Sequence, residues 1–253
     1  MGKADSVLVT GGGGFIGSHL AGRLVEEGYR VRVLDNWASG RRENLARWLG
    51  EIELVEGDIC DAELVRRAVR GARWVFHLAA LASVPLSLER PVEFAQVNIG
   101  GTVNLLKASA DARVERFVFA SSSSCYGASP ELPKREELPA KPLSPYGLSK
   151  LVGEQYCQLF SESFGLETVS LRYFNVFGPR QALRSHYASV VPAFITALLE
   201  GQPPTIDGDG EQTRDFTYVA NAVEATVRAA RAGGAGVSGE VFNVGSGERH
   251  SVK

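Results

Sequence analysis

A tyrosine and a lysine four residues apart are the first side chains in this sequence that could do acid–base chemistry. They are Tyr146 and Lys150, in the segment YGLSK, and on a helix this spacing places them on one face. A lysine ammonium beside a tyrosine stabilises the phenolate, lowering the tyrosine pKa from its ordinary value of about 10. Taken alone, such a pair is common and usually lies at the surface.

Four consecutive serines stand upstream, in the segment ASSSSCYG that begins at Ala120. They follow an apolar run that predicts a buried strand, and α/β sheets bind ligands at the carboxyl ends of their strands. A hydroxyl there could hold a substrate oxygen, although a serine-rich loop could also be inert.

The segment TGGGGFIGSHL, which begins at Thr10, joins the apolar run VLV to an expected helix. Read from Gly12 it is GxGxxG, and read from Gly11 it is GxxGxxG; both patterns occur in strand-to-helix turns that hold a dinucleotide pyrophosphate. A glycine-rich turn can also be merely compact. The glycines alone do not choose between the two phasings.

An acidic residue closes the second expected strand, about 20 residues after the glycines, where a ribose-binding acid should lie. This residue, Asp35, would accept hydrogen bonds from a ribose 2′-hydroxyl and repel a 2′-phosphate, and Asn36 rather than arginine follows it. NAD is therefore favoured over NADP. Arg41 and Arg42 are interpreted as a solvated helix start. Asp58 either lies at the adenine edge or shares a helix N-cap with Asp61, and the spacing supports both equally.

Short β-rich runs alternate with helix-length segments as far as residue 174, and the runs are apolar almost throughout. This pattern predicts an α/β fold with a Rossmann-type doubly wound parallel sheet. Beyond it, prolines and glycines interrupt the rhythm. We expect residues 1–174 and 217–245 to form the NAD-binding domain, and residues 175–216 and 246–253 to form part of a smaller C-terminal substrate-binding lobe. Since the chain stops just after a strand, we expect that lobe to be truncated.

The composition excludes several classes of function. The 253 residues carry a net charge of -2, which gives no indication of a nucleic-acid partner. No secretory leader or long apolar span is present, and the three cysteines are widely spaced, so we expect a cytoplasmic protein without a membrane partner. The four histidines show no metal-ligand spacing, so no metal is expected.

Together, the glycine segment, the strand-end serines and the Tyr146/Lys150 pair resemble the short-chain dehydrogenase/reductase superfamily. Its pattern GxxGxxG selects Gly11, Gly14 and Gly17 as the pyrophosphate-turn glycines. More narrowly, the chain resembles the NAD-dependent sugar-nucleotide epimerase/dehydratase family over residues 7–247, through motifs such as HLAA, VNIGGTVNLL, SPYGLSK, LRYFNVFGPRQ and DGDGEQTRDFTYV. Within that family it looks closest to the UDP-glucose and UDP-N-acetylglucosamine 4-epimerases.

The resemblance implies two sets of binding residues. Besides the three glycines, Tyr146 and Lys150, the NAD contacts would be Phe15, Ile16, Asp35, Asn36, Asp58, Ile59, Leu78, Ala79, Ala80, Asn98 and Phe174. The UDP-sugar contacts would be Ser83, Ser122, Ser123, Tyr146, Asn175, Tyr187, Ala188, Val191 and Arg214. Arg214 would grip the pyrophosphate, the alternative being a surface ion pair with Asp215. A homodimer through helices near residues 92–110 and 147–164 is also implied.

The implied reaction is 4-epimerisation through a transient 4-keto sugar, with NAD as hydride carrier. Tyr146 would be the base, Lys150 would tune it and hold the ribose, and Ser122 would bind the 4-oxygen; Ser123 and Ser124 rank below it as helpers. His77 is interpreted as a packed strand-end histidine. Which UDP-sugar is used stays open.

Two alternatives remain beside the epimerase. The related 4,6-dehydratases carry an Asp-Glu pair after the catalytic threonine, and the related decarboxylases carry a glutamate in this loop, whereas this chain has Ser123 and Ser124. A non-catalytic NAD-binding protein is the other alternative. Such relatives typically lose the Tyr/Lys pair, which is present here, so the epimerase is favoured.

Overall fold

A computed structural model of the chain describes residues 5–182, 189–206, 208–233 and 236–253. Its centre is a seven-stranded sheet in the order β10-β6-β5-β4-β1-β2-β3, in which every neighbouring pair is parallel. The strands are β1 (Ser6–Thr10), β2 (Arg30–Asp35), β3 (Ile52–Glu56), β4 (Trp74–His77), β5 (Arg116–Ser122), β6 (Thr168–Tyr173) and β10 (Glu240–Val244). The order 3-2-1-4-5-6 is that of the Rossmann fold, so the predicted fold class is confirmed.

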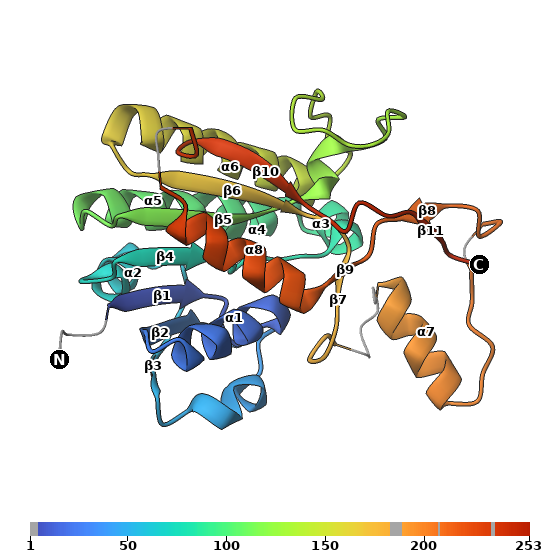
Figure 1. The fold of residues 1–253 in the computed structure, drawn as a ribbon, viewed down its shortest axis with the longest axis horizontal. Coiled ribbons are helices and arrows are strands. Elements are labelled where there is room, and N and C mark those ends of the chain that lie inside the picture. The colour runs from blue at the N-terminus through green and yellow to red at the C-terminus, as the bar shows by residue number, and fades with distance from the viewer. Residues whose placement is uncertain (1–4, 183–188, 207, 234–235) are drawn as a thin grey trace.

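Helices cover both faces of this sheet (Figure 1). The α-helices are α1 (Phe15–Glu26), α2 (Ala62–Val69), α3 (Val84–Glu89), α4 (Pro91–Phe94), α5 (Gly101–Asp111), α6 (Pro145–Phe164), α7 (Val190–Leu199) and α8 (Val219–Arg231). Helical segments of other types are the 3₁₀ segments η1 (Arg42–Trp48) and η3 (Ser123–Tyr126) and the π-helical segment η2 (Ala95–Gly100). Helices α1 and α8 lie on one face, and α2, α5 and α6 lie on the other.

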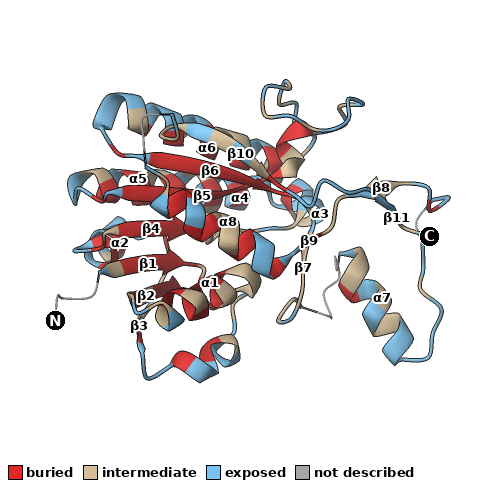
Figure 2. Cartoon of the chain, viewed as in Figure 1, coloured by how far each residue is buried: buried red, intermediate tan, exposed pale blue. Residues whose placement is uncertain are grey.

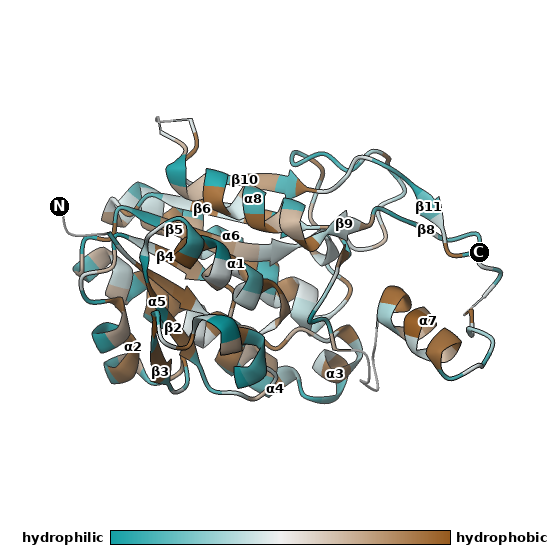
Figure 3. Ribbon diagram, turned by 60° about the horizontal axis from the view of Figure 1, so that its bottom comes forward, coloured by the Kyte–Doolittle hydropathy of each residue, from teal (hydrophilic) through white to brown (hydrophobic). Residues whose placement is uncertain are grey.

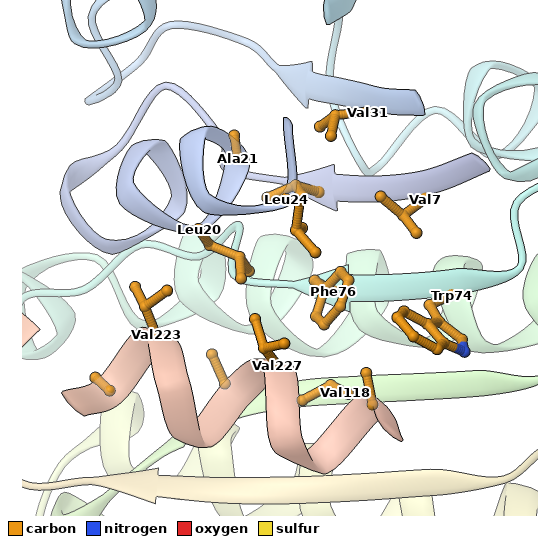
Figure 4. Packing of buried hydrophobic residues seen from close by; sticks show 14 of the residues in the cluster. Val7, Leu20, Ala21, Leu24, Val31, Trp74, Phe76, Val118, Val223 and Val227 are labelled. Carbon is orange, nitrogen blue, oxygen red and sulfur yellow. The ribbon is translucent and has the colours of Figure 1, made fainter. Parts of the chain in front are cut away.

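Side-chain alternation along each strand produces two hydrophobic cores, since successive residues of a strand point to opposite faces. Val7 and Val9 of β1 pack toward α1 and α8, whereas Leu8 packs toward α2 and α5. All three are fully buried. Figure 2 shows the buried strands at the centre, and Figure 4 shows Leu20, Val223 and Val227 from α1 and α8 meeting the sheet residues.

The segments after β6 leave the sheet and return to it. β7 (Val176–Phe177) pairs with β9 (Thr217–Tyr218), and β8 (Thr213–Arg214) pairs with β11 (His250–Ser251). Helix α7 stands apart from the sheet and is apolar (Figures 1 and 3), with Leu198 and Leu199 exposed. The division into an NAD-binding domain and a substrate-binding lobe stays a prediction.

The two-core arrangement predicts that Leu24→Ala will destabilise the fold. Leu24 is fully buried between α1 and the sheet, so truncation leaves a cavity that costs about 2–5 kcal/mol of unfolding free energy. Urea denaturation followed by circular dichroism measures the loss. Leu49→Ala, at an exposed leucine, is the matched control and should change stability by at most about 0.5 kcal/mol. Equal losses for the two variants would contradict the assignment of this core.

Candidate active site

The sequence-predicted polar residues gather at one edge of the sheet, because the strands are parallel and their carboxyl ends point the same way. Thr10 ends β1, His77 ends β4 and Ser122 ends β5. β1 and β4 are also neighbours at the point where the strand order reverses, with Thr10 directly opposite His77. Open α/β sheets bind their ligands in the crevice at such a switch point.

The glycine turn has the geometry of the GxxGxxG phasing. Gly11 has a φ of +68°, and a β-carbon there would lie 2.7 Å from the Ala79 amide nitrogen. A β-carbon on Gly17 would overlap the Gly11 carbonyl oxygen. Gly14 is the N-cap of α1 and donates a 3.1 Å hydrogen bond to that same oxygen. Phe15 and Ile16 then open the helix, so the helix N-terminus faces the space where a phosphate would bind.

Gly12 and Gly13 are also tightly packed. A β-carbon on Gly12 would lie 2.7 Å from Val33 Cγ1, and one on Gly13 would lie 2.5 Å from the Trp37 ring. Every glycine of the run therefore has a packing reason, but backbone collides only at Gly11 and Gly17. That difference supports the phasing that the resemblance selected.

Asp35 is buried at the end of β2, and both of its carboxylate oxygens bind backbone amides. Oδ2 accepts a 2.9 Å hydrogen bond from Gly13 N–H, and Oδ1 accepts a 2.8 Å bond from Trp37 N–H. The residue predicted to bind ribose thus also orders the glycine turn beside it. Nearby, Arg42 pairs with Glu56 and stacks on Trp37, which agrees with its interpretation as a surface residue.

The structure separates the two interpretations of Asp58. Asp61 alone caps α2, accepting hydrogen bonds from Glu63 N–H and Leu64 N–H. Asp58 instead accepts hydrogen bonds from Cys60 N–H at 2.8 Å and from the Asn36 amide at 2.9 Å. Partial burial opposes its ionisation, but these hydrogen bonds prevail and lower the pKa of Asp58. Asp58 and Asn36 therefore lie together at the ends of β3 and β2, and the shared-cap interpretation is wrong.

Helix α6 brings Tyr146 and Lys150 to the serine segment. Ser144 caps the helix by accepting a 3.1 Å hydrogen bond from Gly147 N–H, and Pro145 fixes its first turn. Lys150 is buried, and its Nζ donates a 2.8 Å hydrogen bond to the Ala120 carbonyl. Burial lowers the pKa of Lys150 to about 8.

Tyr146 departs from the expected pKa. Burial raises the pKa of its phenol, and a hydrogen bond with Ser122 partly opposes that rise. The residues of the chain alone thus do not make Tyr146 the easily ionised base that the sequence suggested, so lowering its pKa depends on positive charge brought close by a ligand. Tyr146 and Ser122 therefore belong to the same edge of the sheet, and their catalytic roles stay a prediction.

Among the other serines, Ser124 binds Ser122: its N–H donates to Ser122 Oγ at 3.1 Å, and Ser122 Oγ donates to Ser124 Oγ at 3.1 Å. Ser123 lies beside them in η3 and is partly buried. Ser121 points elsewhere and donates a 2.5 Å hydrogen bond to Glu154 Oε1.

Sequence reasoning missed the buried ion pair between Glu154 and Arg172. Arg172 binds both carboxylate oxygens of Glu154, at 2.9 and 2.7 Å, and stacks over the Tyr126 ring. Both partners are less than 10% exposed. The pair ties α6 to β6 and fixes the serine segment through Ser121. The available signal was an arginine inside the apolar run TVSLRYF, which needs a buried partner.

The predicted substrate residues are spread over several elements. Ser83 caps α3, Asn175 has a φ of +34° and donates to the Asp215 carbonyl at 2.9 Å, and Val191 lies on α7. Tyr187 and Ala188 lie outside the described residues. Several predicted NAD contacts follow or flank the sheet strands: Leu78, Ala79 and Ala80 follow β4, Ile59 packs against Gly101, Asn98 lies in η2, and Phe174 follows β6.

Arg214 does not form the surface ion pair that sequence reasoning kept as its alternative. It is exposed on β8, and its Nη1 donates to the Thr213 carbonyl. The Asp215 carboxylate instead accepts hydrogen bonds from Ser246 and Gly247. The guanidinium of Arg214 is therefore free of any carboxylate among the residues that the structure describes.

The described residues hold no group of three or more His, Cys, Asp or Glu side chains arranged to bind a metal ion. No helix among them is long and apolar enough to span a bilayer.

Residues 7–245 match the model of the NAD dependent epimerase/dehydratase family. The chain is 41% identical to a putative UDP-glucose 4-epimerase of Methanocaldococcus jannaschii, over 97% of its own length and 78% of the relative's. It is 37% identical to a UDP-N-acetyl-alpha-D-glucosaminuronate decarboxylase of Bacillus cytotoxicus, over 97% of its own length and 76% of the relative's. The chain therefore belongs to the NAD-dependent epimerase/dehydratase family.

Solved structures agree with this assignment. A UDP-N-acetylglucosamine 4-epimerase from Methanobrevibacter ruminantium, in complex with UDP-N-acetylmuramic acid, superposes with a TM-score of 0.94 at 41% identity, over 99% of this chain and 79% of that one. A Thermus thermophilus UDP-glucose 4-epimerase in complex with NAD superposes with a TM-score of 0.88 at 41% identity, over 98% of this chain and 79% of that one. NAD is the cofactor of this family, and the glycine turn and Asp35 fit it.

The glycine geometry predicts that Gly17→Ala will weaken NAD binding and destabilise the fold, because its β-carbon would overlap the Gly11 carbonyl oxygen. Titration calorimetry with NAD and thermal unfolding measure the two effects. Gly100→Ala is the control, since Gly100 also lies in a helical segment but a β-carbon there meets nothing within 4 Å. If Gly17→Ala bound NAD as tightly as the control, the phasing would be wrong.

Proposed function

We propose that this protein catalyses the NAD-dependent 4-epimerisation of a UDP-hexose, either UDP-glucose/UDP-galactose or the N-acetylated pair. The observation that carries the proposal is that α6 brings Tyr146 and Lys150 to the strand-end serines, where Lys150 Nζ donates a 2.8 Å hydrogen bond to the Ala120 carbonyl. The relatives named as 4-epimerases support it.

Each of the three residues has a role that its surroundings favour. Tyr146 takes the proton of the 4-hydroxyl, and Ser122, at the end of β5, binds the 4-oxygen. The Lys150 ammonium stabilises the phenolate and holds the nicotinamide ribose. Bound NAD would supply an acceptor for the hydrogen of carbon 4. The low-dielectric surroundings that raise the pKa of Tyr146 also strengthen every charge interaction with it.

The remaining NAD contacts are proposed by position. Gly11, Gly14 and Gly17 let the backbone approach the pyrophosphate, and Asp35 accepts hydrogen bonds from the adenosine ribose. The others are Phe15, Ile16, Asn36, Asp58, Ile59, Leu78, Ala79, Ala80, Asn98 and Phe174. Residues 1–174 and 217–245 form the NAD-binding domain in this proposal.

The UDP-sugar would bind toward the segments that leave the sheet. Arg214 suits the pyrophosphate, because its guanidinium is always charged and is not engaged by Asp215. Ser83, Ser123, Asn175, Tyr187, Ala188 and Val191 complete the proposed substrate contacts. Residues 175–216 and 246–253 contribute this lobe.

The loop that holds Ser123 and Ser124 also bears on two other activities of the family, 4,6-dehydration and decarboxylation. A 4,6-dehydratase needs an acid and a base to eliminate water, and a decarboxylase of this family carries a glutamate here, but Ser123 and Ser124 supply neither carboxyl group. A decarboxylase is nevertheless among the relatives, so it is the second candidate. A non-catalytic NAD-binding role is disfavoured, because such relatives typically lose the Tyr/Lys pair, and both Tyr146 and Lys150 are present here.

A cytoplasmic homodimer is proposed with the enzyme. Exposed apolar side chains lie along α3, α4 and α6, and include Leu88, Val92, Leu148 and Leu159. Apolar surface grouped in this way is typical of protein interfaces. Sedimentation equilibrium at micromolar concentration gives the oligomeric state.

Incubation with UDP-glucose, UDP-galactose, their N-acetylated forms and the uronic acids, followed by proton NMR, tests the function. Inversion at carbon 4 of at least one substrate supports the epimerase. A 4-keto-6-deoxy product identifies a dehydratase, and release of carbon dioxide from a uronic acid identifies a decarboxylase. Bound NAD with every sugar unchanged identifies a non-catalytic protein.

Tyr146→Phe should abolish turnover while the fold and NAD binding survive, because only the proton-accepting oxygen is removed. General acid–base catalysis contributes about 10²–10⁴-fold, and we expect a loss at or above the top of that range. The coupled epimerase assay measures it, with NAD occupancy recorded alongside. Tyr29→Phe, at the opposite end of the sheet, is the control. If Tyr146→Phe retained most of the activity, Tyr146 could not be the base and the proposed mechanism would be wrong.

Asp35→Ala should lower NAD affinity and reduce discrimination against NADP. The carboxylate both orders the glycine turn through Gly13 N–H and repels a 2′-phosphate. Dissociation constants for both cofactors, measured by calorimetry, give the ratio. Glu53→Ala, at an exposed residue of β3, should leave that ratio unchanged. An unchanged ratio for Asp35→Ala would refute the assignment.

A further inference from the structure

His77 is a buried ionisable residue that the proposed chemistry does not use. It ends β4 and is 1% exposed. Its Nδ1 lies 2.8 Å from Thr10 Oγ1, and its Nε2 lies 2.8 Å from Thr102 Oγ1. Thr10 immediately precedes the glycine turn, and Thr102 lies on α5. One imidazole therefore joins the cofactor turn to a helix on the far face of the sheet.

The surrounding hydrogen bonds assign the protons of this imidazole. The Thr102 hydroxyl donates to the Asn98 carbonyl at 2.6 Å, so toward His77 it can only accept, and Nε2 carries the hydrogen. Burial together with the Lys150 charge lowers the pKa of His77 to about 3, so the imidazole is neutral and Nδ1 carries no hydrogen. Nδ1 therefore accepts a hydrogen bond from the Thr10 hydroxyl, whose oxygen also accepts from Ala79 N–H.

The same network continues to the catalytic helix. The Asn98 side chain clamps Leu81 from both sides, accepting from Leu81 N–H at 2.9 Å and donating to the Leu81 carbonyl at 3.0 Å. It also donates to Ser149 Oγ at 3.0 Å, and Ser149 Oγ donates to the Tyr146 carbonyl at 2.8 Å. Asn98 lies in a π-helical segment, a geometry that is frequent at functional sites.

Residues 78–81 are consequently held at both ends. At one end, Leu78 N–H and Ala79 N–H donate to the backbone and side-chain oxygens of Thr10. At the other end, Leu81 is clamped by Asn98. His77 connects the two anchor points through Thr10 and Thr102. This segment touches the glycine turn at Ala79, which a β-carbon on Gly11 would approach to 2.7 Å, and is linked to α6 through Asn98 and Ser149.

We propose that His77, through Thr10 and Thr102, is a positioning residue that sets residues 78–81 and Tyr146 relative to the glycine turn. The proposal rests on the proposed function for its catalytic consequence. A shift of about 1 Å in such a constellation costs about 10²-fold in rate, so a buried network that fixes two halves of the site acts on kcat even though it touches no reacting atom.

The structure offers a matched pair of variants, Thr102→Val and Thr226→Val. Each threonine is 1% exposed, lies on a helix and donates a 2.6 Å hydrogen bond to the carbonyl four residues earlier. Each also meets an aromatic side chain from a strand, which is His77 for Thr102 and Tyr173, at 2.7 Å, for Thr226. Only Thr102 belongs to the network that reaches Leu81 and Tyr146.

Epimerase turnover, normalised to bound NAD, should fall about 10- to 100-fold in Thr102→Val, with KM for the UDP-sugar little changed. Thr226→Val should keep its kcat although its melting temperature falls similarly. Thr102→Ser retains the hydroxyl and should restore most of the kcat. Equal kcat values for the two valine variants, or no rescue by serine, would overturn the proposal.

Amide hydrogen exchange of residues 78–83 provides a readout that does not depend on turnover. Thr102→Val should accelerate exchange at Leu81, whose N–H is bound by Asn98, whereas Thr226→Val should not. If the wild type proves not to be an epimerase, this comparison still decides whether the network positions the segment. Unchanged exchange at Leu81 in Thr102→Val would contradict the proposal.

Discussion

Because helices cover both faces of the seven-stranded sheet, the sheet interior is mostly apolar, and ligand-binding polar groups are expected at the carboxyl ends of the strands. Val7, Leu8 and Val9 show the consequence along a single strand, since each is fully buried and they serve two different cores. Thr10, at the last position of that strand, is its one fully buried polar side chain. The glycine turn, the serine segment and the start of α6 all meet at this edge.

Polar groups that remain buried at this edge must satisfy one another, and this requirement organises the site. Glu154 binds Arg172 through two hydrogen bonds and receives a third from Ser121. Removing one partner of such a buried pair typically costs about 3–5 kcal/mol, because the other charge is left uncompensated. The pair therefore fixes α6 against β6 and, with them, Tyr146 against Ser122.

Sequence reasoning could predict the features that are encoded locally. The apolar runs gave the parallel sheet, the Tyr146/Lys150 spacing indicated one helix face, and the resemblance selected Gly11, Gly14 and Gly17, which the backbone contacts support. It could not predict the Thr10–His77–Thr102 network, because His77 is separated from its partners by 67 and 25 residues. It also left Asp58 ambiguous, since a cap and a strand-end contact have the same local spacing.

The raised pKa of Tyr146 marks the step that the chain alone does not complete. In the proposed mechanism Tyr146 is the proton acceptor, and positive charge from bound ligands would have to lower the pKa that burial raises. The spacing of Tyr146 and Lys150 can therefore be recognised in the sequence, but the pKa of Tyr146 cannot, because it depends on burial and on bound ligands. It also makes the fate of the hydrogen on carbon 4 the central question.

The most direct measurement is incubation of the protein with a UDP-hexose that carries deuterium at carbon 4, followed by deuterium and proton NMR of the products. The account predicts inversion at carbon 4 with the deuterium retained there, because the hydrogen leaves that carbon and returns to its opposite face without meeting water. Epimer in which the deuterium has been replaced by solvent hydrogen, or no epimer from any UDP-hexose, would contradict it.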